Sequence, residues 1–139
     1  MRAGRRRMTS DVAQRPRVLV ADDHPEIVKA IRRLLALDCD VVGTVSDGAD
    51  VLGAVQRLRP DVVVIDLNLP TVSGLEVCRQ ITHMQPATKV IMFTAANDPH
   101  LRQRAVEVGA SAFVCKVGTD DDLLSTIKSV WDARPTPDL

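Results

Sequence analysis

The feature that most constrains this fold is a regular alternation of short apolar runs with longer segments of helical periodicity. The apolar runs are rich in β-branched residues and lie at 18–21, 41–45, 62–65, 90–93 and 112–116. The helical segments begin at Pro25, Gly48, Ser73, Asp98 and Thr119, and their apolar residues recur three or four positions apart. Because a strand, a helix and a second strand form a right-handed βαβ unit, the alternation predicts an α/β protein. Its parallel sheet would carry helices on both faces.

Local signals mark where several of these helices begin and end. Pro25 suits the first position of a helix, where its missing N–H would be unpaired in any residue. Ser73 and Glu76 have the spacing of a capping box, which predicts a helix start at that point. Asp98 opens a further helix, and Gly109 is predicted to stop it.

The length of 139 residues allows one domain with a substantial core and is too short for two ordinary domains. Residues 1–17 contain six Arg and one Asp and therefore have a net charge of +5. Because the net charge of the whole chain is zero, residues 18–139 have a net charge of −5. We predict a basic, flexible tail at 1–16, one domain at 17–132 and a flexible tail at 133–139. The arginines at 5–7 could contact nucleic acid or anionic lipid, although a disordered tail also accounts for them.

The composition excludes several classes of protein. Aromatic residues make up only 2% of the chain, which disfavours a stacking platform for single-stranded nucleic acid. The three cysteines are an odd number without a C-x-x-C pair, which suits buried thiols in a reducing compartment. No apolar run approaches the roughly 18 residues of a membrane span. We therefore expect a cytoplasmic protein that does not interact with membranes.

Polar side chains follow four of the predicted strands at their carboxyl ends. Asp22 and Asp23 follow the first strand, Asp66 the third, Thr94 the fourth and Lys116 the fifth. In a parallel sheet of strand order 2-1-3-4-5, the first and third strands are neighbours at the point where ligands bind. The three aspartates should therefore meet there, with the threonine and the lysine beside them.

This set of residue types is suited to phosphoryl transfer. Three neighbouring carboxylates repel one another, and a divalent cation relieves that repulsion; all-oxygen ligation favours Mg²⁺. Asp66 can act as the nucleophile that accepts a phosphoryl group. The Lys116 ammonium and the Thr94 hydroxyl can stabilise phosphoryl oxygens. Any one of these residues alone could simply end a strand, but that explanation accounts poorly for five of them at the matching ends of four strands.

Residues 17–132 resemble the receiver domain of two-component response regulators, most closely the NarL/FixJ branch. The resemblance rests on the opening Val18-Leu-Val-Ala-Asp22-Asp23-His-Pro and on Asp66, Thr94 and Lys116 at matching positions. It implies a flavodoxin-like (CheY-like) doubly wound fold with five parallel strands in the order 2-1-3-4-5 and five helices.

The resemblance also assigns roles to individual residues. Asp66 matches the phosphoacceptor, and Asp22 and Asp23 match the acidic pair that holds Mg²⁺ together with Asp66. Asn68 matches the position whose backbone carbonyl completes the metal shell. Thr94 matches the switch hydroxyl, and Phe113, three residues before Lys116, matches the switch aromatic. Without the resemblance, Phe113 would be interpreted as an ordinary core residue.

The function implied is that of a phosphoacceptor, not of an enzyme. A sensor histidine kinase would phosphorylate Asp66, and the face formed by the fourth helix, the fifth strand and the fifth helix would change shape. Regulators of this branch carry a helix-turn-helix DNA-binding domain after the receiver. The residues after 132 are too few for one, so the output would lie in a C-terminal continuation or on a separate protein. Dimerisation on phosphorylation is a further expectation.

Several alternatives stay open at the level of sequence. Lys116 is followed by Val117, whereas many receivers have proline there. A phosphohydrolase of the haloacid-dehalogenase type also uses Asp, Thr and Lys with Mg²⁺, although Asn68 stands where its second aspartate would be expected. A degenerate receiver that only binds partners is the other class. His24 is interpreted as a helix-start residue near the site, with a transition-metal ligand as the alternative.

Overall fold

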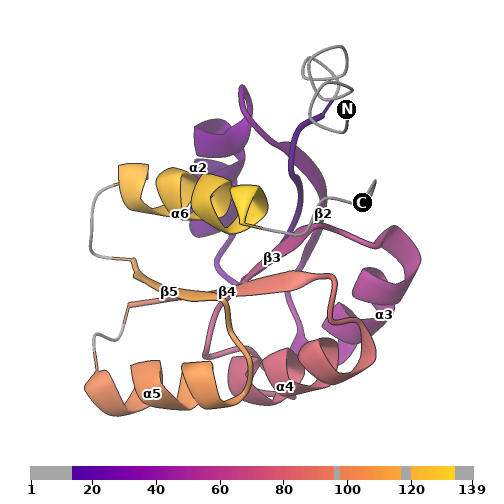
Figure 1. The fold of residues 1–139 in the computed structure, drawn as a ribbon, viewed down its shortest axis with the longest axis vertical. Coiled ribbons are helices and arrows are strands. Elements are labelled where there is room, and N and C mark those ends of the chain that lie inside the picture. Colours follow the sequence, from indigo (N-terminus) through magenta and orange to yellow (C-terminus); the bar gives the residue numbers. More distant parts are fainter. Residues whose placement is uncertain (1–13, 96–97, 117–119, 134–139) are drawn as a thin grey trace.

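The computed structural model describes residues 14–95, 98–116 and 120–133 of the chain. This part contains five strands and five helices in strict alternation (Figure 1). In chain order they are β1 (Arg17–Ala21), α2 (Pro25–Leu35), β2 (Asp40–Val45), α3 (Gly48–Leu58), β3 (Val62–Ile65), α4 (Gly74–Met84), β4 (Lys89–Thr94), α5 (Pro99–Glu107), β5 (Ala112–Cys115) and α6 (Asp120–Asp132). The predicted alternation is confirmed.

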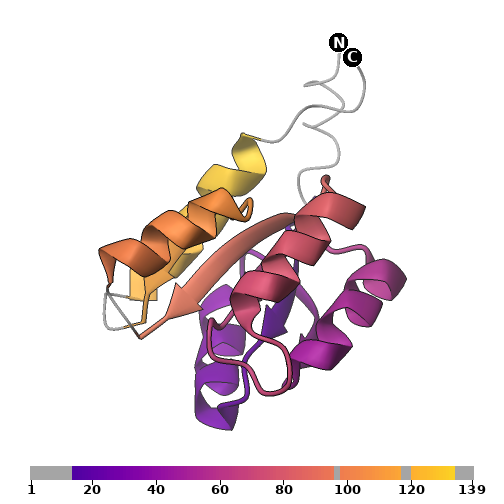
Figure 2. The same ribbon diagram turned by 90° about the horizontal axis from the view of Figure 1, so that it is seen from below.

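The strands form one parallel sheet in the order β2-β1-β3-β4-β5, which confirms the predicted doubly wound fold. Helices α2 and α6 cover one face of the sheet, and α3, α4 and α5 cover the other (Figure 1). Figure 2 shows α3, α4 and α5 side by side across their face. None of the described helices is long and apolar enough to cross a membrane.

The central strand β3 shows why a continuous apolar run fits this position. All four of its residues are at most 1% exposed. Val62 and Val64 pack into the core beneath α2 and α6, whereas Val63 and Ile65 pack into the core beneath α3, α4 and α5. A strand with a helical layer on each face needs apolar side chains in both directions, and the sequence supplies them.

The described helix starts follow the sequence signals, except that one capping box is incomplete. The predicted start of the last helix, Thr119, lies outside the described residues. Pro25 stands in the first turn of α2, and Asp98 caps α5 by accepting a hydrogen bond from the His100 N–H. Ser73 Oγ caps α4 by accepting from the Glu76 N–H at 3.3 Å. The reciprocal bond of a capping box is not formed, because the Glu76 carboxylate instead accepts hydrogen bonds from Arg79 and Gln80.

Residues 14–16, which precede β1, are held at the end of the sheet opposite the aspartates. Arg15 Nη2 donates hydrogen bonds to the carbonyl oxygens of Ala36 and Cys39 at 2.7 and 2.6 Å. These carbonyls lie just beyond the last turn of α2, where backbone acceptors lack helical partners. Of the predicted tail at 1–16, residues 14–16 fall within the described part of the chain.

Candidate functional site

Asp22 and Asp66 follow directly after the adjacent strands β1 and β3, as predicted. The Asp66 N–H donates to the Ala21 carbonyl at 2.9 Å, so the sheet pairing extends to the residues that carry the carboxylates. Both aspartates are only 3% exposed, whereas the Asp23 side chain is 36% exposed. The sheet therefore fixes two buried carboxylates side by side and places a third at the surface.

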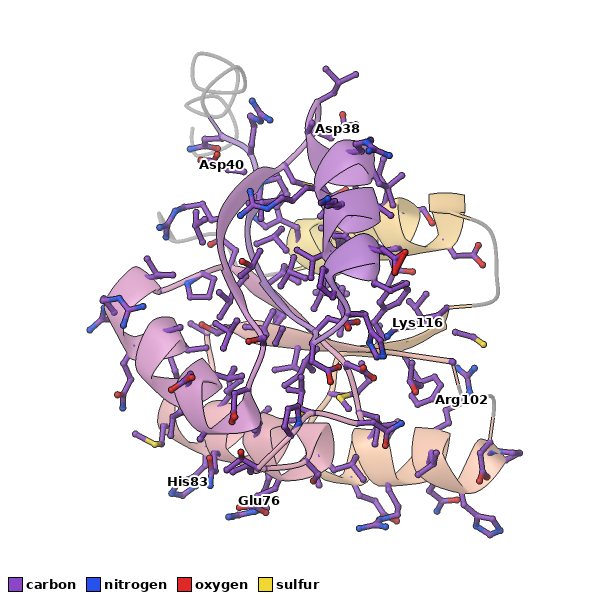
Figure 3. All side chains as sticks on the ribbon, turned by 180° about the vertical axis from the view of Figure 1, so that it is seen from behind. Asp38, Asp40, Glu76, His83, Arg102 and Lys116 are labelled. Atoms are coloured by element: carbon purple, nitrogen blue, oxygen red, sulfur yellow. The ribbon has the colours of Figure 1, made fainter. Side chains whose placement is uncertain are left out.

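Lys116 follows β5 and reaches back across the edge of the sheet to these carboxylates. Its Nζ atom donates to Asp66 Oδ2 at 3.2 Å and lies 2.7 Å from Asp22 Oδ2, an ion pair without hydrogen-bond geometry. The Lys116 N–H donates to the Thr94 carbonyl at 2.7 Å, which fixes where the side chain starts. Figure 3 shows Lys116 pointing into the interior of this edge. The ammonium, 11% exposed, thus partly compensates two buried negative charges.

His24 lies over the carboxylates, where the sequence favoured only a helix-start residue near the site. Its Nδ1 atom is 2.8 Å from Asp22 Oδ1, 3.2 Å from Asp23 Oδ1 and 3.8 Å from Asp66 Oδ2. The hydrogen bond to Asp22 and the charges of Asp22 and Asp23 raise the pKa of His24 above its ordinary range. The side chain is nevertheless 59% exposed, so solvent reaches it freely.

The donor set fits a hard divalent cation. Asp22 Oδ2 is buried and accepts no hydrogen bond among the described residues. One ligand atom from each of Asp22, Asp23, His24 and Asp66 lies within 4.8 Å of the others. The oxygens come from carboxylates, the ligands that Mg²⁺ takes in proteins. Asn68, the fourth predicted metal residue, lies two residues after Asp66, and its N–H donates to Asp66 Oδ1 at 3.2 Å.

Two glycines bring helices against the loop that follows Asp66. A Cβ atom on Gly74 would lie 2.3 Å from the Asp66 carbonyl oxygen, and one on Gly48 would lie 2.0 Å from the Val72 carbonyl oxygen. The Gly74 N–H donates to the Leu67 carbonyl at 2.9 Å. Neither close approach leaves room for a side chain, so both positions require glycine. The sequence assigned neither glycine a chemical role at the site, because their effect is on backbone position.

The same loop has a backbone constraint at Thr71, which has φ of 73°. A β-branched residue is strained in this left-handed region. The Thr71 hydroxyl donates to Asp47 Oδ2 at 2.9 Å, while Asp47 Oδ1 accepts from Ala49 at the start of α3. The loop is therefore tied to the amino terminus of α3.

Thr94 and Phe113 share one face of the sheet. Thr94, 1% exposed, pairs with Cys115, and Phe113 pairs with Met92 two residues before Thr94. Phe113 is half-buried against the core on the side of α3, α4 and α5. Val117 lies outside the described residues, so the predicted difference in the loop after Lys116 stays a prediction.

Comparison with known proteins decides the family. Residues 18–128 match the family described as the response regulator receiver domain. The chain belongs to this family. Receiver domains are signalling proteins that are generally not classed as enzymes; they work with sensor histidine kinases and bind Mg²⁺ at an acidic pocket. This receiver has an aspartate cluster of that chemical type, formed by Asp22, Asp23 and Asp66.

The relatives support the NarL-like placement of this receiver. The response regulator GacA of Pseudomonas aeruginosa is 32% identical over 117 residues, which are 83% of this chain and 55% of GacA. The DNA-binding transcriptional activator EvgA of Escherichia coli is 30% identical over 112 residues, which are 80% of this chain and 55% of EvgA. A LuxR-family two-component response regulator from Aurantimonas sp. SI85-9A1 matches with a TM-score of 0.83 at 29% identity. That match covers 90% of this receiver and 92% of that chain. This receiver thus spans about half the length of the two curated relatives.

Proposed function

We propose that Asp66 accepts a phosphoryl group from the phosphohistidine of a sensor histidine kinase. The observation that carries the proposal is the position of Asp66: 3% exposed, at the carboxyl end of the central strand, with the Lys116 ammonium 3.2 Å away. A P–O bond forms at an Asp66 carboxylate oxygen as the P–N bond breaks. The kinase imidazole leaves and takes up a proton from solvent. Carboxylate nucleophiles of this kind form acyl phosphates.

The neighbouring residues have separate roles in this proposal. Asp22, Asp23, Asp66 and the backbone carbonyl of Asn68 would hold Mg²⁺. The bound ion would supply charge neutralisation for the phosphoryl oxygens. Lys116 forms an ion pair with a phosphoryl oxygen in place of its contact with Asp66 Oδ2.

The phosphorylated receiver signals through the sheet face that carries Thr94. The acyl phosphate adds roughly two negative charges and new acceptor oxygens at Asp66. Thr94 donates its hydroxyl to one of these oxygens, and Phe113 turns into the space beside it. The face of α5, β5 and α6 then changes shape and controls an output domain or partner. The relative EvgA is described as a DNA-binding transcriptional activator, which supports a DNA-binding output. Formation of a homodimer on phosphorylation is a further part of the proposal.

The test is phosphorylation with acetyl phosphate and Mg²⁺, followed by intact-mass measurement. We expect one phosphoryl group per wild-type chain and none on Asp66→Asn, because an amide is not a competent nucleophile. Asp61→Asn is the matched control: Asp61 lies at the other end of β3 and accepts a hydrogen bond from the Arg17 N–H at 2.9 Å. It should be labelled like the wild type.

Other outcomes would contradict the proposal in different ways. Full labelling of Asp66→Asn would place the acceptor elsewhere. Continuous release of phosphate without a stable adduct would indicate a phosphohydrolase instead. No labelling of the wild type would indicate a receiver that acts only by binding.

A further inference from the structure

The ring of Phe113 is covered by an arginine from the neighbouring helix. The guanidinium carbon Cζ of Arg102, on α5, lies 4.7 Å from the centroid of the Phe113 ring. Figure 3 shows the Arg102 side chain extending from α5 toward the sheet. A guanidinium over the face of an aromatic ring at this distance makes a cation–π contact.

Arg102 has no competing ionic partner in the part of the chain that the structure describes. The ion pairs found there involve His24, Arg79, Lys116 and Lys128. Arg102 is exposed and Phe113 is half-buried, so the ring lies between solvent and core with the guanidinium on its outer side. The ring is therefore the main interaction of the guanidinium.

The alternation of β5 and β4 fixes which way Phe113 can move. Phe113 and Thr94 are on the same face of the sheet, with Thr94 paired to Cys115, two residues beyond Phe113. Movement of the ring toward Thr94 is a movement along this face. Because the ring would move relative to the guanidinium, the contact with Arg102 belongs to its present, outer position.

We propose that Arg102 is a latch that holds Phe113 outward and thereby keeps the unphosphorylated receiver inactive. The proposal rests on the proposed function, because it needs Phe113 to move when Asp66 is phosphorylated. A ligand that binds one of two conformations more tightly shifts the equilibrium toward that conformation. By the same reasoning, a contact that Arg102 makes only when Phe113 points outward shifts the equilibrium toward the outward state. A cation–π contact at an exposed site changes such an equilibrium constant about two- to fivefold.

The proposed latch and a simple electrostatic role of Arg102 predict opposite changes in the affinity for beryllofluoride. Beryllofluoride, which stands for the phosphoryl group on Asp66, binds the state in which Phe113 is inward. If Arg102 disfavours that state, Arg102→Ala should tighten beryllofluoride binding about two- to fivefold, since apparent affinity scales with the competent fraction. If Arg102 acted only as a positive charge near an anionic ligand, its removal would weaken binding.

The experiment is a beryllofluoride titration in Mg²⁺ followed by NMR of protein labelled with ring ¹³C phenylalanine. The chain has two phenylalanines, Phe93 and Phe113, so a Phe93→Leu variant assigns both signals. Arg104→Ala is the matched control, because Arg104 is an exposed arginine on the same helix that makes no ring contact among the described residues. We expect Arg102→Ala to shift the free-state Phe113 signal toward its bound position and to tighten binding, and Arg104→Ala to do neither.

The outcomes distinguish the latch from the function on which it rests. If the Phe113 signal of the wild type moves on binding but Arg102→Ala matches Arg104→Ala, the latch is wrong and the switch stands. If Arg102→Ala weakens binding, the arginine acts through its charge and the latch is wrong. If the wild type binds beryllofluoride without any movement of Phe113, both the latch and the proposed switch are overturned.

Discussion

Adding one methyl group at Gly74 or at Gly53 should have opposite effects on the stability of this receiver. Both residues lie in helices, Gly74 at the start of α4 and Gly53 in the middle of α3. A Cβ atom on Gly74 would lie 2.3 Å from the Asp66 carbonyl oxygen and 2.9 Å from Leu67 Cα, whereas one on Gly53 would meet nothing within 4 Å. Gly74→Ala therefore presses on the backbone that carries the phosphoacceptor, and Gly53→Ala extends into solvent.

The size of each effect follows from these distances. Ordinary contact begins at 3.4 Å, so the Asp66 loop must retreat by about 1 Å in Gly74→Ala, which strains the 2.9 Å hydrogen bond from the Gly74 N–H to Leu67. Overpacking against backbone and the weakened bond together should cost about 2–4 kcal/mol. Gly53→Ala should stabilise by about 0.5–1 kcal/mol, because alanine loses less backbone entropy in a helix. The two variants should thus differ in free energy of unfolding by about 2.5–5 kcal/mol.

Urea denaturation followed by circular dichroism measures both changes against the wild type. Gly74→Ala should also be labelled more slowly by acetyl phosphate, because the displaced loop carries Asp66, whereas Gly53→Ala should be labelled normally. A Gly74→Ala protein as stable as the wild type would show that the loop yields without cost. Glycine would then not be required at position 74.

Three further predictions concern other parts of the molecule. The pKa of His24 is raised in the folded protein, so its pairing with the aspartates stabilises the fold when the imidazole is protonated. This stabilisation is complete at pH values below the unfolded-state pKa of about 6.5 and is lost as the pH rises through the folded-state pKa. In Mg²⁺-free denaturation, His24→Asn should therefore lose stability relative to wild type at low pH but not at high pH; a difference independent of pH would contradict this. Burial raises the pKa of Cys39 to about 11 and of Cys78 to about 12. A thiol reagent at mildly alkaline pH should therefore label only the partly exposed Cys115 in the folded protein, but all three cysteines in denaturant. Thr88→Val should destabilise by about 1–3 kcal/mol and Thr88→Ser by less, as measured by urea denaturation, because the buried Thr88 hydroxyl donates to the Pro60 carbonyl at 2.9 Å and accepts from Gln85 Nε2 at 2.9 Å.

The fold and the location of the aspartates were predictable because they depend on backbone pattern. A run of four apolar residues such as Val62–Ile65 needs both faces of its strand to be covered, and the alternation of strands with helices favours parallel pairing between two helical layers. The carboxyl ends of parallel strands meet at one edge, so Asp22 and Asp66 had to be neighbours once β1 and β3 were adjacent. Only the strand order needed more than the local pattern.

The side chains that reach across elements were not predictable in the same way. His24 was expected near the site, but its position over three carboxylates depends on a rotamer and on the Asp22 oxygen that its own N–H approaches at 2.9 Å. Glu76 had the spacing of a capping box, yet Arg79 and Gln80, three and four residues along the same helix, offer it competing partners. In each case several partners were available, and the sequence does not rank them.

Strand periodicity also explains why the groups around Asp66 divide into two sets. Side chains alternate along a strand, so Phe93 and Thr94 point to opposite faces of β4. Phe113, in β5, and Lys116, directly after it, are an odd number of residues apart and also point to opposite faces. The Lys116 ammonium accordingly lies 5.6 Å from the Phe93 ring, and Phe93 packs toward α2 and α6, whereas Phe113 packs toward α3, α4 and α5. The charge that neutralises the acceptor and the aromatic side chain proposed to move are therefore separated by the sheet. A change at Phe113 or Arg102 can consequently alter the proposed switch without moving the lysine that the transfer of the phosphoryl group requires.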